Sequence, residues 1–220
     1  MRNKIIFWII LIAILGLVPL TILPTINFTV IRLPSVALNV FQRFFGLTAF
    51  VLLFWQIIIG ANMEKLTKKL GGWVFNFHVW EGIIIYFLLI LHPLMFMFFQ
   101  HFIGQGTDPI NVFLGVCLFC DPKIEYFYTL GRVAFWLITI GVFAGLYRSA
   151  NPFMKKNWRK FHVLNYFVFL LIGVHGFILG PDLPTKPFIY FAIPVYLIIL
   201  YTIVRKLPGL FASYRKWISS

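Results

Sequence analysis

Four histidines lie in long apolar segments of this sequence, and they form two pairs with nearly equal spacing. His78 and His92 bound the segment FHVWEGIIIYFLLILH, and His162 and His175 bound FHVLNYFVFLLIGVH. An imidazole in hydrocarbon is costly unless a partner satisfies it, so ionisable groups in such segments are functional candidates. At a rise of about 1.5 Å per residue, the two histidines of each segment lie roughly 20 Å apart along a helix. The spacing therefore predicts two levels of histidines.

The composition predicts that these segments cross a membrane. Hydrophobic residues make up 61% of the chain, aromatic residues 20% and charged residues 11%, which is unlike a soluble domain. A membrane-spanning helix needs about 20 apolar residues. Six such runs are present, over residues 5–23, 36–60, 73–103, 126–147, 161–180 and 187–204. The first is too long for a secretory signal and has no small-x-small cleavage site after it. The predicted fold class is an all-α integral membrane protein, a bundle of six transmembrane helices.

The basic residues predict the orientation of the bundle. The chain has 19 Lys and Arg residues and a formal net charge of +13. Fourteen of them fall at the N-terminus, in the loops at 61–72 and 148–160, and in the C-terminal tail. The opposite side has five: Arg32, Arg43, Lys123, Arg132 and Lys186. By the positive-inside rule, both termini are expected to be cytoplasmic. The charge reflects this topology and anionic membrane lipid, so nucleic acid is not an expected partner.

The loops on the opposite side carry four carboxylates and both cysteines. The carboxylates are expected to be solvated, with cation attraction as the sharper alternative: Asp108, Asp121, Glu125 and Asp182. Cys117 and Cys120 form a C-x-x-C pair. On an outer face this pair fits a local disulfide and two packed thiols equally well, and an active redox motif less well.

Helix direction pairs the histidines by height. With both termini on one side, the third and fifth spans run in the same direction, so His78 is level with His162 and His92 with His175. A porphyrin iron needs one ligand on each axial side, and neutral imidazole nitrogen suits it. Two bis-histidine haems require this arrangement. Ligands on two levels roughly 20 Å apart cannot converge on one zinc or di-iron site, and a proton relay does not need the pairing.

The fifth span departs from an ideal helix. Fourteen residues rotate a helix by about 1400°, about 40° short of complete turns, so the histidines of the third span share a face. Thirteen residues leave the histidines of the fifth span roughly 140° out of alignment. We therefore expect the fifth span to be kinked, bulged or tilted, and Gly173 and Gly176 offer a place for this.

Basic side chains near each histidine level are candidates for binding haem propionates, because Arg is well shaped for carboxylates. Arg43 and Arg132 are the better candidates, since they lie on the side that is poor in positive charge. At the other level, Arg148, Arg159 and Lys160 already have an explanation in the positive-inside rule.

Two further ionisable residues belong to the third span. His101 lies about half a turn round the helix from His92 and is expected to be an interfacial side chain rather than a ligand. Glu81 follows His78 by three residues and so lies on a neighbouring face. It is either a solvated group at the helix end or a group that tunes the inner haem or a proton path.

The sequence resembles the ferric-reductase-like transmembrane domain, a superfamily that includes ferric reductases, NADPH oxidases and the haem subunit of periplasmic methionine-sulfoxide reductase systems. The resemblance covers residues 40–204 and rests on the two histidine pairs, on YTLGRVAFW at the start of the fourth span and on NWRKFHVLNY entering the fifth. It implies a single transmembrane haem domain over residues 1–220. The four paired histidines are then the axial ligands of b-type haem. The first ligand position is often not histidine in the methionine-sulfoxide subunits, so His78 favours two haems over one.

The function that this resemblance implies is transmembrane electron transfer by an oxidoreductase component of the cell membrane, expected to be a bacterial plasma membrane. The donor is a separate cytoplasmic flavoprotein, a quinol or a further domain outside this sequence, and the acceptor outside is a species such as Fe(III) or oxygen. Larger family members continue into flavin and nicotinamide domains, but this chain has no G-x-G-x-x-G motif and ends at Ser220. Two alternatives are a haem subunit that feeds a periplasmic methionine-sulfoxide reductase and a non-redox transporter component.

Overall fold

The computed structural model describes residues 2–26, 33–106, 108–119, 121 and 123–218, and over these residues it contains helices and no β-strand. Arg32 and Cys120 lie outside this part of the chain. Six described helices are long and apolar enough to cross a membrane: Asn3–Thr25, Pro34–Ala61, Trp73–Phe102, Glu125–Leu146, Pro152–Leu179 and Ile189–Lys206. The prediction of an all-α, six-span membrane protein is confirmed.

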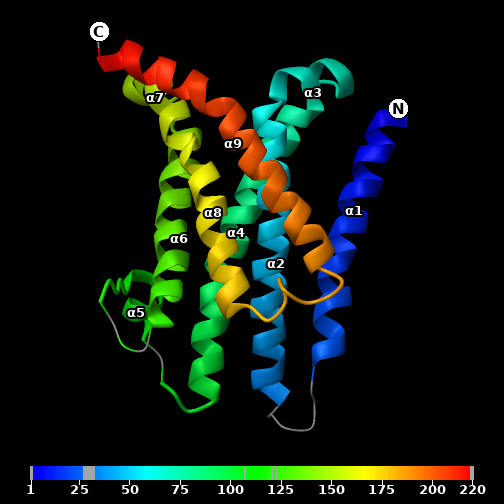
Figure 1. The fold of residues 1–220 in the computed structure, drawn as a ribbon, viewed down its shortest axis with the longest axis vertical. Helices are drawn as coiled ribbons and strands as arrows, with labels where there is room; N and C mark the ends of the chain where they lie inside the picture. Colours follow the sequence, from blue (N-terminus) through cyan, green and yellow to red (C-terminus); the bar gives the residue numbers. More distant parts are fainter. Residues whose placement is uncertain (1, 27–32, 107, 120, 122, 219–220) are drawn as a thin grey trace.

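The chain passes through the bundle in alternating directions (Figure 1). In chain order, the long helices are α1 (Arg2–Ile22), α2 (Leu33–Ala61), α4 (Trp73–Phe102), α6 (Glu125–Leu146), α8 (Leu164–Leu179) and α9 (Ile189–Ile218). A 3-10 turn, η1 (Leu23–Thr25), extends α1. Both termini therefore lie at one end of the bundle, and α4 and α8 are parallel, as the pairing of the histidines by height requires.

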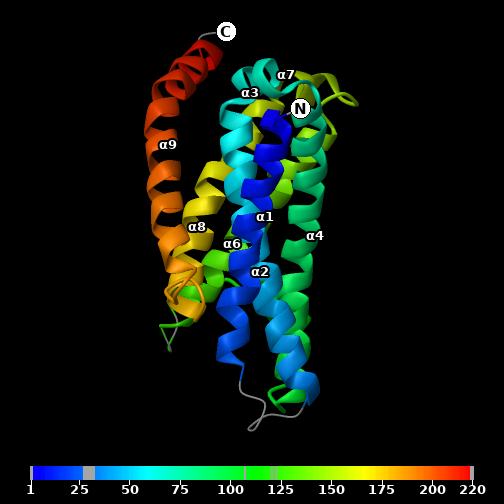
Figure 2. The ribbon, with the colours of Figure 1, turned by 90° about the vertical axis from the view of Figure 1, so that its right-hand side faces the viewer.

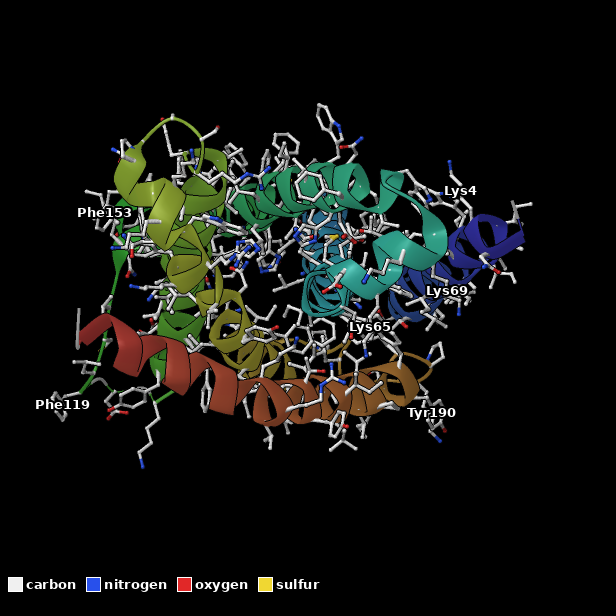
Figure 3. The ribbon with its side chains drawn as sticks, turned by 90° about the horizontal axis from the view of Figure 1, so that it is seen from above. Lys4, Lys65, Lys69, Phe119, Phe153 and Tyr190 are labelled. Atoms are coloured by element: carbon white, nitrogen blue, oxygen red, sulfur yellow. The ribbon has the colours of Figure 1, made fainter. Side chains whose placement is uncertain are left out.

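Three short helices lie at the ends of the bundle: α3 (Met63–Leu70), α5 (Pro109–Leu114) and α7 (Pro152–His162). Of these, α3 and α7 lie at the end that carries both termini (Figure 1). The residues Leu66 and Leu70 of α3 pack against the core, whereas Lys68 is exposed. The helix ends at Gly71, whose φ of 101° favours glycine. Figure 3 looks onto this end and shows Lys4, Lys65 and Lys69 there.

Two helix pairs form the centre of the bundle, because α2 packs mainly against α4, and α6 mainly against α8. The helix α1 lies against α2, and α9 flanks the bundle beside α8 and α2 (Figure 2). Phe50 of α2 packs against Phe169 of α8, with ring centroids 4.9 Å apart and the rings tilted by 31°, and both side chains are buried. Lipid tails are as apolar as these side chains, so van der Waals packing and close backbone approach hold the helices together, rather than burial from water.

The fifth predicted span is broken into two helices. The helix α7 ends at His162, Val163 separates the helices, and α8 begins at Leu164. Val163 lies between the two histidines of this span, and its φ of −62° and ψ of −24° are still helical, so the interruption is confined to one residue. The expected departure from an ideal helix is confirmed, but it lies at Val163 and not at Gly173 or Gly176, which are inside α8.

Asp182, in the loop after α8, is buried, and the prediction that it is solvated is wrong. It is 3% exposed. Arg43 of α2 donates from Nε to Asp182 Oδ2 at 2.8 Å and from Nη2 to the other carboxylate oxygen. The same Nη2 donates to Thr25 Oγ1. The Asp182 carboxylate is thus removed from water and paired with an arginine that lies 139 residues away in the chain. Asp108 and Asp121 are exposed, as expected.

We expect Asp182→Asn to lower the free energy of unfolding by about 3–5 kcal/mol, because it leaves the Arg43 guanidinium buried without a counter-charge. Unfolding of the purified protein in mixed detergent micelles measures this change. Glu64→Gln is the control, since it breaks a Lys68–Glu64 pair whose side chains are 76% and 81% exposed, and an exposed pair contributes little. Equal stabilities of the two variants would contradict the structural role of the buried pair.

Candidate functional site

The structure brings the four histidines together in two facing pairs. We call His78 and His162, which lie nearer the end with both termini, the inner pair, and His92 and His175 the outer pair. The ring centroids of the inner pair are 6.0 Å apart with an interplanar angle of 71°. Those of the outer pair are 6.4 Å apart with an angle of 76°. The two pairs have nearly the same geometry at two levels of the bundle.

Each histidine ring lies close to a glycine of the helix that packs on its own helix. The four contacts are His78 with Gly60, His92 with Gly46, His162 with Gly145 and His175 with Gly131. A Cβ at Gly131 would lie 2.7 Å from ring atoms of His175, and one at Gly46 would lie 2.9 Å from those of His92. Any larger residue at these two positions would have to displace the ring.

The two halves of the bundle repeat one arrangement. In each half, a long helix with two glycines 14 residues apart (α2 or α6) is followed by a segment with two histidines. In the first half α4 carries both histidines, whereas in the second half α7 ends with His162 and α8 carries His175. The tripeptide Phe-His-Val occurs at the inner histidine of both halves, at residues 77–79 and 161–163. The glycines were missed as site residues in the sequence analysis, although their shared spacing of 14 residues was a signal for them.

The outer pair is held by backbone carbonyls. His92 Nδ1 lies 2.8 Å from the carbonyl oxygen of Gln42, and His175 Nδ1 lies 2.8 Å from that of Phe127. Each carbonyl belongs to the residue four positions before the contacting glycine. A carbonyl oxygen only accepts, so Nδ1 carries the proton and donates it, and Nε2 keeps its lone pair. This bond sets the tautomer and the ring orientation that metal-ligating histidines commonly have.

The inner pair makes no hydrogen bond this close. The buried Nδ1 atoms of His78 and His162 have no partner at hydrogen-bond geometry within the described residues, although the His162 ring interacts with the backbone of Gly141, four positions before Gly145. Gln56 Nε2 donates to the His78 carbonyl at 2.9 Å, but its Oε1 has no partner, nor has Asn165 Oδ1. Buried polar atoms usually find a partner in protein or water. The inner level is therefore where the described side chains satisfy one another least.

Glu81 belongs to this inner level. It is 2% exposed, which rules out the interpretation as a solvated group at the helix end. Neither of its carboxyl oxygens has a hydrogen-bond partner in the described part of the chain. Glu81 follows His78 by three residues and Asn165 follows His162 by three, so the two unsatisfied polar side chains occupy equivalent places in the two halves of the bundle.

Arg132 lies at the level of the outer pair. It follows Gly131, donates from Nη1 to the Gly115 carbonyl at 2.8 Å and lies 3.6 Å from Glu125 Oε2. Beside it is a cavity of about 250 Å³ whose lining includes Phe96, Gln100 and Tyr128. Arg43, the other predicted partner of a propionate, is next to Gln42 but bonds to Asp182 and Thr25 as described above. Arg132 is itself part of the lining of this cavity.

The remaining sequence candidates are not members of the two pairs, although Arg148 lies close enough to the inner pair to interact electrostatically with His78 and His162. His101 is exposed, as expected for an interfacial residue. The guanidinium of Arg148 lies 5.8 Å from the centroid of the Trp158 ring, which is itself 5.6 Å from that of His162. Cys117 is disulfide-bonded, so the alternative of two packed free thiols is wrong. Cys120 is outside the described residues.

The ring separations fit one porphyrin iron between the members of each pair. With a metal–imidazole bond of about 2 Å on each side, two axial imidazoles have ring centres roughly 6 Å apart. The described residues contain no group of three or more His, Cys, Asp or Glu side chains that could hold a metal ion on its own. Two nitrogens per level suit an iron whose other ligands come from a macrocycle.

Comparison of the chain with protein-family models, with curated proteins and with solved structures finds no match. The class that the fold and site define is therefore a multi-pass α-helical membrane protein with two facing histidine pairs.

We expect Gly131→Ala to destabilise the protein by about 1–3 kcal/mol, as overpacking does, because the new methyl group would push His175 off the Phe127 carbonyl. Gly145→Ala is the matched control on the same helix, since its Cβ would lie 4.0 Å from His162 Nδ1, an ordinary contact. Thermal unfolding of both variants measures the difference. Equal behaviour of the two variants would mean that the outer ring has room to move.

Proposed function

We propose that this chain carries electrons across a membrane by means of two b-type haems, one ligated by His78 and His162 and the other by His92 and His175. The observation that carries the proposal is that the two rings of each pair face each other across parallel helices, with centroids 6.0 Å apart in the inner pair and 6.4 Å apart in the outer pair. A haem, when bound, supplies a one-electron Fe(III)/Fe(II) couple. The resemblance to ferric-reductase-like transmembrane domains supports the same function.

The protein's own residues suit a carrier of electrons better than a site that binds oxygen. The two histidines at each level would both ligate the iron of a bound haem, which would leave no place on the metal for a substrate. At the outer pair, the bonds to the carbonyls of Gln42 and Phe127 fix the rings and raise their basicity as ligands. The glycines at 46 and 131 let the backbone approach these rings closely. Arg132 is placed to bind a propionate.

The distribution of charge supports a direction for the transfer. The end with both termini carries most of the Lys and Arg residues, which is the cytoplasmic pattern. The donor is then a cytoplasmic flavoprotein or a quinol at the inner pair, and the acceptor, such as Fe(III) or oxygen, lies outside. The location we propose is the plasma membrane of a bacterium.

The test is the haem content of the purified protein, measured with reduced-minus-oxidised spectra. We expect about two haems per chain in the wild-type protein and about one in His78→Ala, because one ligand pair is lost. The control is His101→Ala, which removes an exposed histidine and should leave both haems.

Three other outcomes would each overturn part of this proposal. One haem per chain that persists in His78→Ala would restrict haem to the outer pair, as expected for a subunit of a methionine-sulfoxide reductase system. Absence of haem after expression with excess haem would contradict electron transfer and favour a non-redox transporter component. An equal loss in His101→Ala would show that the spectra do not report on the pairs.

A further inference from the structure

A second cavity lies at the end of the bundle that carries both termini. Its volume is about 270 Å³, and it lies where the end of α2 meets α3 and α9. Figure 3 looks onto this end and shows Lys65 on α3, with α9 running alongside. The lining residues are Ala61, Asn62, Glu64, Lys65, Arg205 and Lys206. None of these residues belongs to the histidine pairs.

The cavity has an excess of positive charge, and one of its cations, Arg205, is positioned by a hydrogen bond. Asn62 donates from Nδ2 to the Ile58 carbonyl at 2.9 Å, and its Oδ1 accepts from Arg205 Nη2 at 3.3 Å. The end of α2 thus positions the guanidinium of α9. The carboxylate of Glu64 is engaged by Lys68 at 2.6 Å. Three cations of the lining therefore face one carboxylate that already has a partner.

An apolar, outward-facing surface leads directly away from the cavity. Along α9, Leu197, Tyr201 and Val204 are 60%, 66% and 65% exposed. Their spacing of four and three residues puts them on one face of the helix. Since α9 belongs to a membrane span, this face contacts acyl chains. The cations of Arg205 and Lys206 follow immediately, at the boundary between apolar and charged surface.

We propose that this cavity binds the phosphate of an anionic phospholipid whose acyl chains lie along the exposed face of α9. The observation behind it is the juxtaposition of a basic cavity with a lipid-facing apolar stripe. A soluble phosphate would use only the cations, whereas a phospholipid matches both surfaces. The bound lipid would join α3 to α9, the helix on the flank of the bundle. The site is independent of the proposed haems.

The test uses the full-length, delipidated protein in a neutral detergent, with phosphatidylglycerol added and thermal unfolding followed. We expect phosphatidylglycerol to raise the unfolding temperature of the wild type. In Lys65→Gln/Arg205→Gln, the apparent affinity should fall about tenfold or more, since each basic residue contributes to attraction for anionic lipid. The control is Lys155→Gln/Lys156→Gln, which removes the same charge from exposed positions of α7 at the same end and should respond like the wild type.

Three results would overturn the proposal. The first is an unchanged affinity in Lys65→Gln/Arg205→Gln. The second is an equal response to phosphatidylcholine, which would show that the headgroup charge does not matter. The third is an equal response to sodium phosphate, which would assign the cavity to a soluble anion. If the double variant does not fold, Lys65→Gln alone is tested, and it should show a loss of affinity in the same direction.

Discussion

The cost of holding imidazoles inside an apolar bundle is the constraint on which the rest of this structure depends. A histidine in hydrocarbon needs partners for its ring nitrogens, and here four such rings lie within two helix pairs. At the outer pair, the backbones of α2 and α6 supply a carbonyl to each Nδ1. That bond requires the neighbouring helix to come close, and the glycines at 46 and 131 allow it. The Nε2 atoms are then left for a ligand that lies between the rings.

The repeat of one arrangement in both halves explains how two levels can have the same geometry. In each half, the spacing of 14 residues between glycines nearly matches the spacing between histidines, so one helix–helix contact serves both levels. The second half has one residue fewer between its histidines, and Val163, where α7 gives way to α8, lies between them. The levels differ in their polar surroundings, because the outer rings bond to backbone carbonyls, whereas Glu81 and Asn165 bring unsatisfied oxygens to the inner level. This asymmetry distinguishes the inner from the outer pair chemically.

The apolar runs predicted all six spans, because the length of a run and its composition are local properties of the sequence. Helix direction and spacing likewise predicted which histidines face each other. The burial of Asp182 could not be predicted from the sequence, because its partner Arg43 is 139 residues away and only the packed bundle brings the two together. The position of the helix break was also missed, because glycines drew attention to Gly173 and Gly176, whereas Val163 has no local signal. The glycines that touch the rings were missed because their role exists only across a helix–helix contact.

Electron transfer across sealed vesicles tests the central claim most directly. Vesicles that contain the haem-loaded protein would hold ferricyanide inside, with the membrane-impermeant reductant dithionite outside. The account predicts that the wild-type protein passes electrons from dithionite to ferricyanide, which loses its colour. His162→Ala and His175→Ala should each abolish this reduction, because the electron path needs both histidine levels. Bleaching at the wild-type rate in either variant, or none in the haem-loaded wild type, would contradict the account.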